Sequence, residues 1–152
     1  MKRWLFFKNK KIVKRVWDEL VNGCRLAAVD ELVSPDFLDH TPLPGMSSGI
    51  EGLHQRLMVL HGAFPDFHSE IEQLIAEGDK VVALITSTGT HQRDFCGAPP
   101  SGRTFAIKEI HIVRVAGGKM IEHWGIPDFF AMLEQLGLVA APWQVASGAA
   151  GA

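Results

Sequence analysis

The sequence contains little cysteine. Cys24 and Cys96 are its two thiols in 152 residues, and neither belongs to a Cys-x-x-Cys or Cys/His pattern. A disulfide framework needs more cysteines than this, and a structural zinc site needs closely spaced Cys or His ligands. Both kinds of stabilised small domain are therefore excluded. Two isolated thiols are typical of a reducing compartment, so we expect a cytoplasmic protein.

Charge of one sign and long apolar runs are also missing. The formal net charge is -2 at pH 7, whereas nucleic-acid-binding proteins usually have a strong basic excess. We therefore expect no nucleic acid and no membrane among the partners. Residues 4–7 form an apolar run that is shorter than the roughly 7–15 residues of a signal peptide. No run approaches the ~18–20 residues of a transmembrane helix.

What the sequence does have is the size and apolar content of one globular domain. Hydrophobic residues make up 47% and charged residues 21% of the chain, close to the average for such domains. A chain of this length buries roughly two thirds of its unfolded surface, which is enough for a core. We predict a single domain over residues 1–152, with its core at about 9–137 and a tail over 138–152 that is rich in Ala, Gly and Ser.

Helical periodicity dominates the first part of the chain. Apolar residues recur at i, i+4 and i+8 with charged residues between them, and Asn9 is expected to cap the first helix. The predicted segments are a helix over residues 9–22, a short helix over 27–33, an extended piece over 36–40, a loop over 41–49 and a helix over about 50–64.

The second part of the chain changes to a period of two, which predicts strands. The segments are strands over residues 67–77, 80–91, 103–115 and 119–124, followed by a helix over 128–136. Helices that precede long antiparallel strands define an α+β fold. We expect a curved sheet wrapped over the three N-terminal helices, a C-terminal helix, and an internal pocket between the layers.

The last two strands predict a cluster of polar side chains on one sheet face. With the hairpin turn centred on Gly117, His111 lies opposite His123 and Glu109 opposite Gly125. These positions share a parity, so their side chains point to the same side of the sheet. Phe105 and Ile107 are expected on that side too.

Four segments then resemble one known family, the SnoaL-like polyketide cyclases. They are Leu32–His40 (LVSPDFLDH), Gly97–Arg103 (GAPPSGR), Gly118–Trp124 (GKMIEHW) and Phe130–Gly137 (FAMLEQLG). The resemblance implies the cone-shaped α+β barrel that is also used by scytalone dehydratase, ketosteroid isomerase and limonene epoxide hydrolase. It also implies ring closure of a polyketide ester by an intramolecular aldol reaction, without cofactor or metal, and a homodimer.

The resemblance places the family's two histidines at His111 and His123 and its acid/base aspartate at Gly125, where this chain has no side chain. We hypothesise that Glu109 replaces this acid as the general base, with His111 and His123 as its partners. A carboxylate in an apolar cavity is expected to have a raised pKa. The alternative interpretation is a buried Glu–His pair that satisfies its own hydrogen bonds.

The candidate substrate-binding residues are His40, Trp17, Phe64, Phe105, Ile107, Gly125 and Asp128. Two of them have a simpler structural interpretation. Asp128 follows a proline and precedes a helix, where an acid usually caps the helix. His40 follows Asp39 at the end of an extended piece, where a loop-stabilising hydrogen bond is the commoner use of such residues.

Three functions follow as hypotheses. The first is a cofactor-free enzyme that abstracts a proton from a hydrophobic carbonyl or ester compound. The second is a protein that binds an apolar small ligand without chemistry. The third is an epoxide hydrolase, which needs an Asp-Arg-Asp constellation; Arg114 is expected on the wrong face for it. A homodimer is expected through the outer sheet face, which carries Ala106, Ile110, Ile112 and Trp124.

Overall fold

A computed structural model describes residues 2–143 of the chain. The helices are α1 (Lys2–Arg15), which continues as a π-helix η1 (Val16–Asn22), a 3-10 turn η2 (Leu26–Ala28), α2 (Val29–Leu32), α3 (Ile50–Ala63) and α4 (Phe129–Gln135). The strands are β1 (Val33–Asp39), β2 (His68–Glu77), β3 (Lys80–Thr90), β4 (Thr104–Ala116) and β5 (Lys119–Pro127). None of the described helices is long and apolar enough to cross a membrane.

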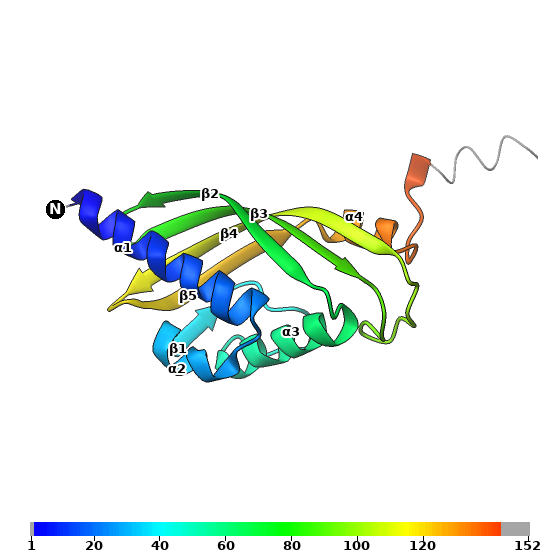
Figure 1. The fold of residues 1–152 in the computed structure, drawn as a ribbon, viewed down its shortest axis with the longest axis horizontal. Helices are drawn as coiled ribbons and strands as arrows, with labels where there is room; N and C mark the ends of the chain where they lie inside the picture. The colour runs from blue at the N-terminus through cyan, green and yellow to red at the C-terminus, as the bar shows by residue number, and fades with distance from the viewer. Residues whose placement is uncertain (1, 144–152) are drawn as a thin grey trace, which may run out of the picture.

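The five strands form one curved sheet in the order β1-β5-β4-β3-β2. Neighbouring strands are antiparallel except for β1, which pairs with β5 in parallel. The N-terminal helices α1, α2 and α3 all lie on the concave side of this sheet, and α4 packs near the far end of β4 (Figure 1). This confirms the predicted α+β class and the cone-shaped arrangement.

The first helix begins earlier than the sequence analysis predicts. It starts at Lys2, and Asn9 is a buried residue within the helix and does not cap it. The lysines that interrupt the apolar start are compatible with the helix because they lie over aromatic rings one turn earlier. The Nζ of Lys8 is 3.7 Å from the centre of the Trp4 ring, and that of Lys11 is 4.7 Å from the Phe7 ring.

The β4–β5 register also differs from the expectation. His111 pairs with Gly125, Val113 with His123, and Glu109 with Pro127. The cause is a two-residue turn at Gly117 and Gly118, both at positive φ, together with a bulge between Val115 and Arg114. Because the displacement is two residues, the face of each side chain is unchanged and the polar cluster survives.

Two apolar clusters lie between the helices and the sheet. The larger joins helices α1 and η1 to β3, β4 and β1, and the smaller is built around Phe64 and Phe105 near α4. The pocket lies where the two clusters meet. It is lined by residues of both clusters and by the inward side chains of β4 and β5.

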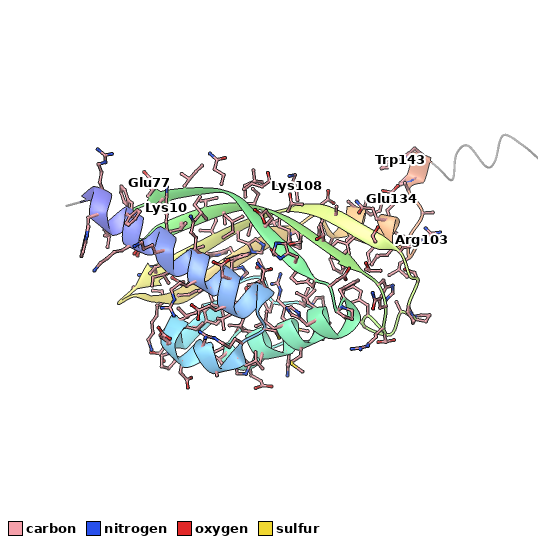
Figure 2. All side chains as sticks on the ribbon, viewed as in Figure 1. Lys10, Glu77, Arg103, Lys108, Glu134 and Trp143 are labelled. Carbon is pink, nitrogen blue, oxygen red and sulfur yellow. The ribbon has the colours of Figure 1, made fainter. Side chains whose placement is uncertain are left out.

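The outer sheet face is partly apolar, as predicted. Ile110 and Ile126 are largely exposed, and Lys108 points away from the helices on the same face (Figure 2). Ile112 and Trp124 are half-buried and Ala106 is exposed. The homodimer expected through this face stays a prediction.

Candidate active site

The pocket is partly open to solvent and mostly apolar. Its free volume is about 90 Å³. Of the predicted site residues, Trp17, Phe105, Ile107, Glu109, His111 and His123 line it. Its walls are aromatic and aliphatic, and its carboxylates and imidazoles lie on the side of the sheet.

Four buried side chains form a continuous hydrogen-bonded chain on that polar side. Glu109 Oε2 lies 2.8 Å from His111 Nε2, and His111 Nδ1 lies 2.9 Å from His123 Nε2. His123 Nδ1 lies 3.0 Å from Asp39 Oδ1. Asp39 is held by Thr41, whose backbone N–H donates to Oδ1 at 2.9 Å. Glu109, His111 and His123 were predicted as site residues from the sequence. Asp39 is a further member of this hydrogen-bonded chain.

The direction of the Glu109 pKa shift corrects one expectation. Burial acts to raise the pKa of Glu109, but the hydrogen bond and charge of His111 outweigh it, and the pKa is lowered. The raised pKa expected for Glu109 is therefore wrong, because an apolar cavity was considered without the imidazole beside the carboxylate. Burial lowers the pKa of His123, and the charge of His111 adds to this effect.

Gly125 makes the two-histidine contact possible. A Cβ at this position would lie 2.7 Å from His111 Nδ1 and 2.9 Å from His123 Cε1. The space that the missing side chain leaves is therefore occupied by the two imidazoles, whose ring centroids are 5.2 Å apart. Glu109 does not lean over Gly125; it contacts His111 two residues along its own strand.

A second polar chain approaches Glu109 from the opposite direction. Trp17 Nε1 donates to Ser69 Oγ at 3.2 Å, and Ser69 Oγ lies 2.9 Å from Ser87 Oγ. A hydrogen bond from Ser87 also contributes to lowering the pKa of Glu109. Trp17 additionally packs edge-on against His111, with centroids 5.1 Å apart. Glu109 is thus fixed from two sides and faces the cavity between them.

Arg56 is the cation of the pocket, and the sequence analysis missed it together with Asp39. Arg56 lies on α3, and its Nη1 is 3.9 Å from Asp39 Oδ2. For both residues the sequence contains a pattern that indicates an inward-facing side chain. Leu53, Arg56, Leu57 and Leu60 share one helix face. Phe37 and Asp39 alternate inward along β1, which turns His40 outward.

The remaining predicted residues do not line the pocket. His40 lies on the outer face, where its ring stacks on Trp124 at 4.3 Å and its Nε2 is 3.0 Å from Glu122 Oε1. Asp128 caps α4 by accepting the Ala131 N–H at 3.1 Å, which confirms the simpler interpretation. Phe64 is fully buried and packs edge-on against Phe105, so it supports the pocket wall from behind.

Arg114 lies on the outer side of the sheet, as expected. Its guanidinium pairs with Asp79 at 2.7 Å and with Glu122 at 2.6 Å. Arg114 and Glu109 lie at different positions along β4 and on opposite faces of the sheet. In residues 2–143 no group of three His, Cys, Asp or Glu side chains is arranged to hold a metal ion. The ionisable groups that line the pocket are two carboxylates, two imidazoles and Arg56.

The pKa shifts of the buried hydrogen-bonded groups predict that the protein loses stability in acid. The folded pKa values of His123, Glu109 and Asp39 lie below their ordinary values of 6.5, 4.5 and 3.8. The unfolded chain then binds more protons than the folded one as the pH falls through this range, so acid favours unfolding. We expect the urea midpoint to decrease from pH 7 to pH 5 and further toward pH 4.

The variant His123→Gln removes the first of these titrations and is expected to flatten the decrease between pH 6.5 and 5. His68 is exposed and provides the matched control. We expect His68→Gln to leave the dependence of the urea midpoint on pH unchanged. A midpoint that is constant or rises between pH 7 and 5 in the unmodified protein contradicts the prediction.

Comparisons with known proteins agree on one family. The family model described as SnoaL-like polyketide cyclase matches residues 11–136. Nogalonic acid methyl ester cyclase of Streptomyces nogalater is 31% identical over 80% of this chain and 90% of its own length. An aklanonic acid methyl ester cyclase of Streptomyces peucetius is 30% identical over 78% of each chain. The crystal structure of IdmH from Streptomyces antibioticus is 31% identical and covers 85% of this chain and 98% of its own, with a TM-score of 0.75.

Proposed function

The chain belongs to the SnoaL-like polyketide cyclase family, and from this premise we propose that it closes a ring in a polyketide ester by an intramolecular aldol reaction. Glu109 is the general base. The observation that carries the proposal is its position: Glu109 is buried at the pocket wall and tied to His111 at 2.8 Å. In this proposal it replaces the acid that the resemblance implies at the position of Gly125.

The reaction needs a base that is ionised at neutral pH and directed at a carbon acid. The lowered pKa of Glu109 keeps its carboxylate ionised. Glu109 takes the proton from the carbon between two carbonyl groups, and the C–H electron pair moves onto a carbonyl oxygen to form an enolate. The enolate carbon attacks a second carbonyl of the same molecule, and the new alkoxide regains the proton from Glu109.

The apolar walls suit a flat, fused-ring substrate. Trp17, Phe105 and Ile107 cover the pocket with little polar surface, so most of a hydrophobic substrate is desolvated on binding. His111 and His123 hold Glu109 in one orientation, and Asp39 holds His123. These residues act through Glu109 as positioning groups, whereas Glu109 touches the reacting carbon.

The proposal is tested with the compounds named by the relatives, nogalonic acid methyl ester and aklanonic acid methyl ester. An aldol ring closure adds and removes no atoms. We expect the purified protein, with a chelator present and no cofactor added, to convert at least one compound into an isomer of identical mass and different retention in liquid chromatography–mass spectrometry.

Two other outcomes identify the alternatives. Tight binding of either ester without an isomeric product supports a binding protein for apolar ligands. Addition of one water to limonene epoxide supports an epoxide hydrolase, for which Arg56 beside Asp39 would supply a carboxylate–arginine pair. Either result, in the absence of an isomeric product, overturns the cyclase proposal.

A further inference from the structure

Arg56 differs from every other polar group of the pocket in how it is satisfied. Glu109, His111, His123 and Asp39 each have hydrogen-bond partners at 2.8–3.0 Å. Within residues 2–143 no hydrogen bond is found for Arg56, and its one ion pair is with Asp39, at the long distance of 3.9 Å. A guanidinium has five N–H donors. Most of the donor capacity of Arg56 is therefore free for a ligand, although its side chain is only 15% exposed.

The positive charge of Arg56 makes an anionic oxygen the ligand that its free donors favour. Asp39 and Glu109 are the carboxylates that face the cavity, with His111 and His123 between them. Arg56 lies near enough to both carboxylates to lower the pKa of each. An anion entering this apolar pocket is repelled by two carboxylates, so it needs the Arg56 guanidinium as its counter-charge.

From these contacts we propose that Arg56 binds the oxygen of an acidic enol or enolate, so that the pocket selects ligands with an ionisable carbonyl–enol system over neutral molecules of the same shape. The inference rests on the proposed cyclase function and deepens it. When Glu109 takes the carbon proton, negative charge develops on the carbonyl oxygen. A preorganised guanidinium in a desolvated site stabilises that charge without reorganisation.

The arrangement assigns the two sides of the pocket different tasks. Glu109 projects from β4 in the sheet, and Arg56 projects from α3 in the helical layer. A flat ligand held between these layers presents its acidic C–H to the sheet and its oxygen to the helix. Guanidinium geometry matters here, because a planar fork can donate two hydrogen bonds to the adjacent oxygens of a dicarbonyl unit, whereas an ammonium acts as a point charge.

The test compares two probes of nearly equal shape, lawsone and its O-methyl ether. Lawsone is a flat hydroxynaphthoquinone whose enol is ionised at neutral pH; the ether is neutral. Titration calorimetry measures both affinities for the full chain and for Arg56→Gln and Arg56→Lys. We expect the unmodified protein to prefer lawsone, Arg56→Gln to lose about tenfold or more of lawsone affinity with the ether unaffected, and Arg56→Lys to retain part of the preference.

A second readout excludes a merely structural effect. The visible spectrum of lawsone reports its ionisation in the bound state, and Arg56→Gln is expected to raise the pH at which bound lawsone ionises. Arg93, an exposed arginine outside the pocket, provides the matched control, because Arg93→Gln changes neither affinity nor spectrum. Thermal unfolding confirms that each variant is folded before its affinity is compared, and Arg56→Lys keeps the test decisive if Arg56→Gln does not fold.

The outcomes separate this inference from the proposed function. Equal affinity for both probes in the unmodified protein, or an unchanged preference in Arg56→Gln, overturns the role of Arg56 even when the polyketide esters are cyclised. An Arg56-dependent preference without any cyclisation retains the enolate site and removes the cyclase. Glu109→Gln is expected to keep the preference for lawsone, since it removes a negative charge from the cavity.

Discussion

Replacing Glu109 with glutamine is expected to reduce turnover of the cyclised ester by roughly 10²- to 10⁴-fold, the usual contribution of a positioned general base. The fold should survive this change. The side-chain oxygen of glutamine can still accept the N–H of His111, which Glu109 accepts at 2.8 Å in the native protein. Glutamine removes the basic lone pair without emptying the space, so ligand affinity is expected to change little.

Three measurements on the same variant distinguish the possible roles of Glu109. Chromatographic rates report catalysis, titration calorimetry reports ligand affinity, and urea unfolding reports stability. A loss confined to the rate supports a catalytic base. A large decrease in the urea midpoint, with parallel losses of rate and ligand affinity, supports a purely structural Glu–His cluster. In that case the substitution removes a hydrogen-bond partner from a buried polar network.

The matched control is Glu77→Gln. Glu77 is exposed at the β2–β3 turn, at the end of the sheet where α1 begins (Figure 2). It has the same chemistry as Glu109 and lies on a strand, but it does not line the pocket. We expect its rate, affinity and stability to match those of the unmodified protein. A catalytic rate that is unchanged in Glu109→Gln would show that the base lies elsewhere.

Local signals in the sequence were sufficient to divide the chain into helices and strands. The change from a helical period to a period of two near residue 67 separates the helices from the strands, and the boundaries of β2, β3 and α3 agree with prediction within one residue. Strand alternation also placed Glu109, His111 and His123 on one buried face. These predictions succeeded because each depends on neighbours within a few residues along the chain.

The parts that failed depend on contacts between distant segments. The parallel pairing of β1 with β5 brings Asp39 beside His123, 84 residues away, and no periodicity encodes that neighbour. The β4–β5 register was displaced by two residues because the turn contains both Gly117 and Gly118 and a bulge adds one residue to one strand. A bulge has no reliable signature in a single sequence. Arg56 was hidden in an apolar stripe because a charged residue on such a stripe is normally assigned to solvent.

The direction of the Glu109 pKa shift also depends on a contact that the sequence alone does not fix. Burial alone predicts a raised pKa, and burial was correctly foreseen. The sign depends on whether His111 lies within hydrogen-bonding distance of the carboxylate, which the strand spacing permits but does not require. The structure supplies this distance, and with it a base that is ionised at neutral pH.

Gly125→Asp, which introduces the acid that the family resemblance implies for this position, is expected to destroy activity in this chain. Any Cβ at this position would lie less than 3.0 Å from both His111 and His123. The two imidazoles are buried and bonded to each other at 2.9 Å, so neither can move without breaking the chain that fixes Glu109. Overpacking of this kind costs about 1–3 kcal/mol, and an added buried carboxylate raises that cost.

Gly125→Ala separates the steric effect from the charge effect, since it adds the Cβ alone. We expect a loss of about 1–3 kcal/mol in urea unfolding and a strongly reduced rate. Gly62→Ala is the matched control: a Cβ there meets nothing within 4 Å, and in helix α3 alanine is expected to stabilise by about 0.5–1 kcal/mol. Full stability and activity in Gly125→Asp would mean that the imidazoles rearrange freely. In that case this chain has retained the family's site and only lost its acid, and Glu109 has no special role.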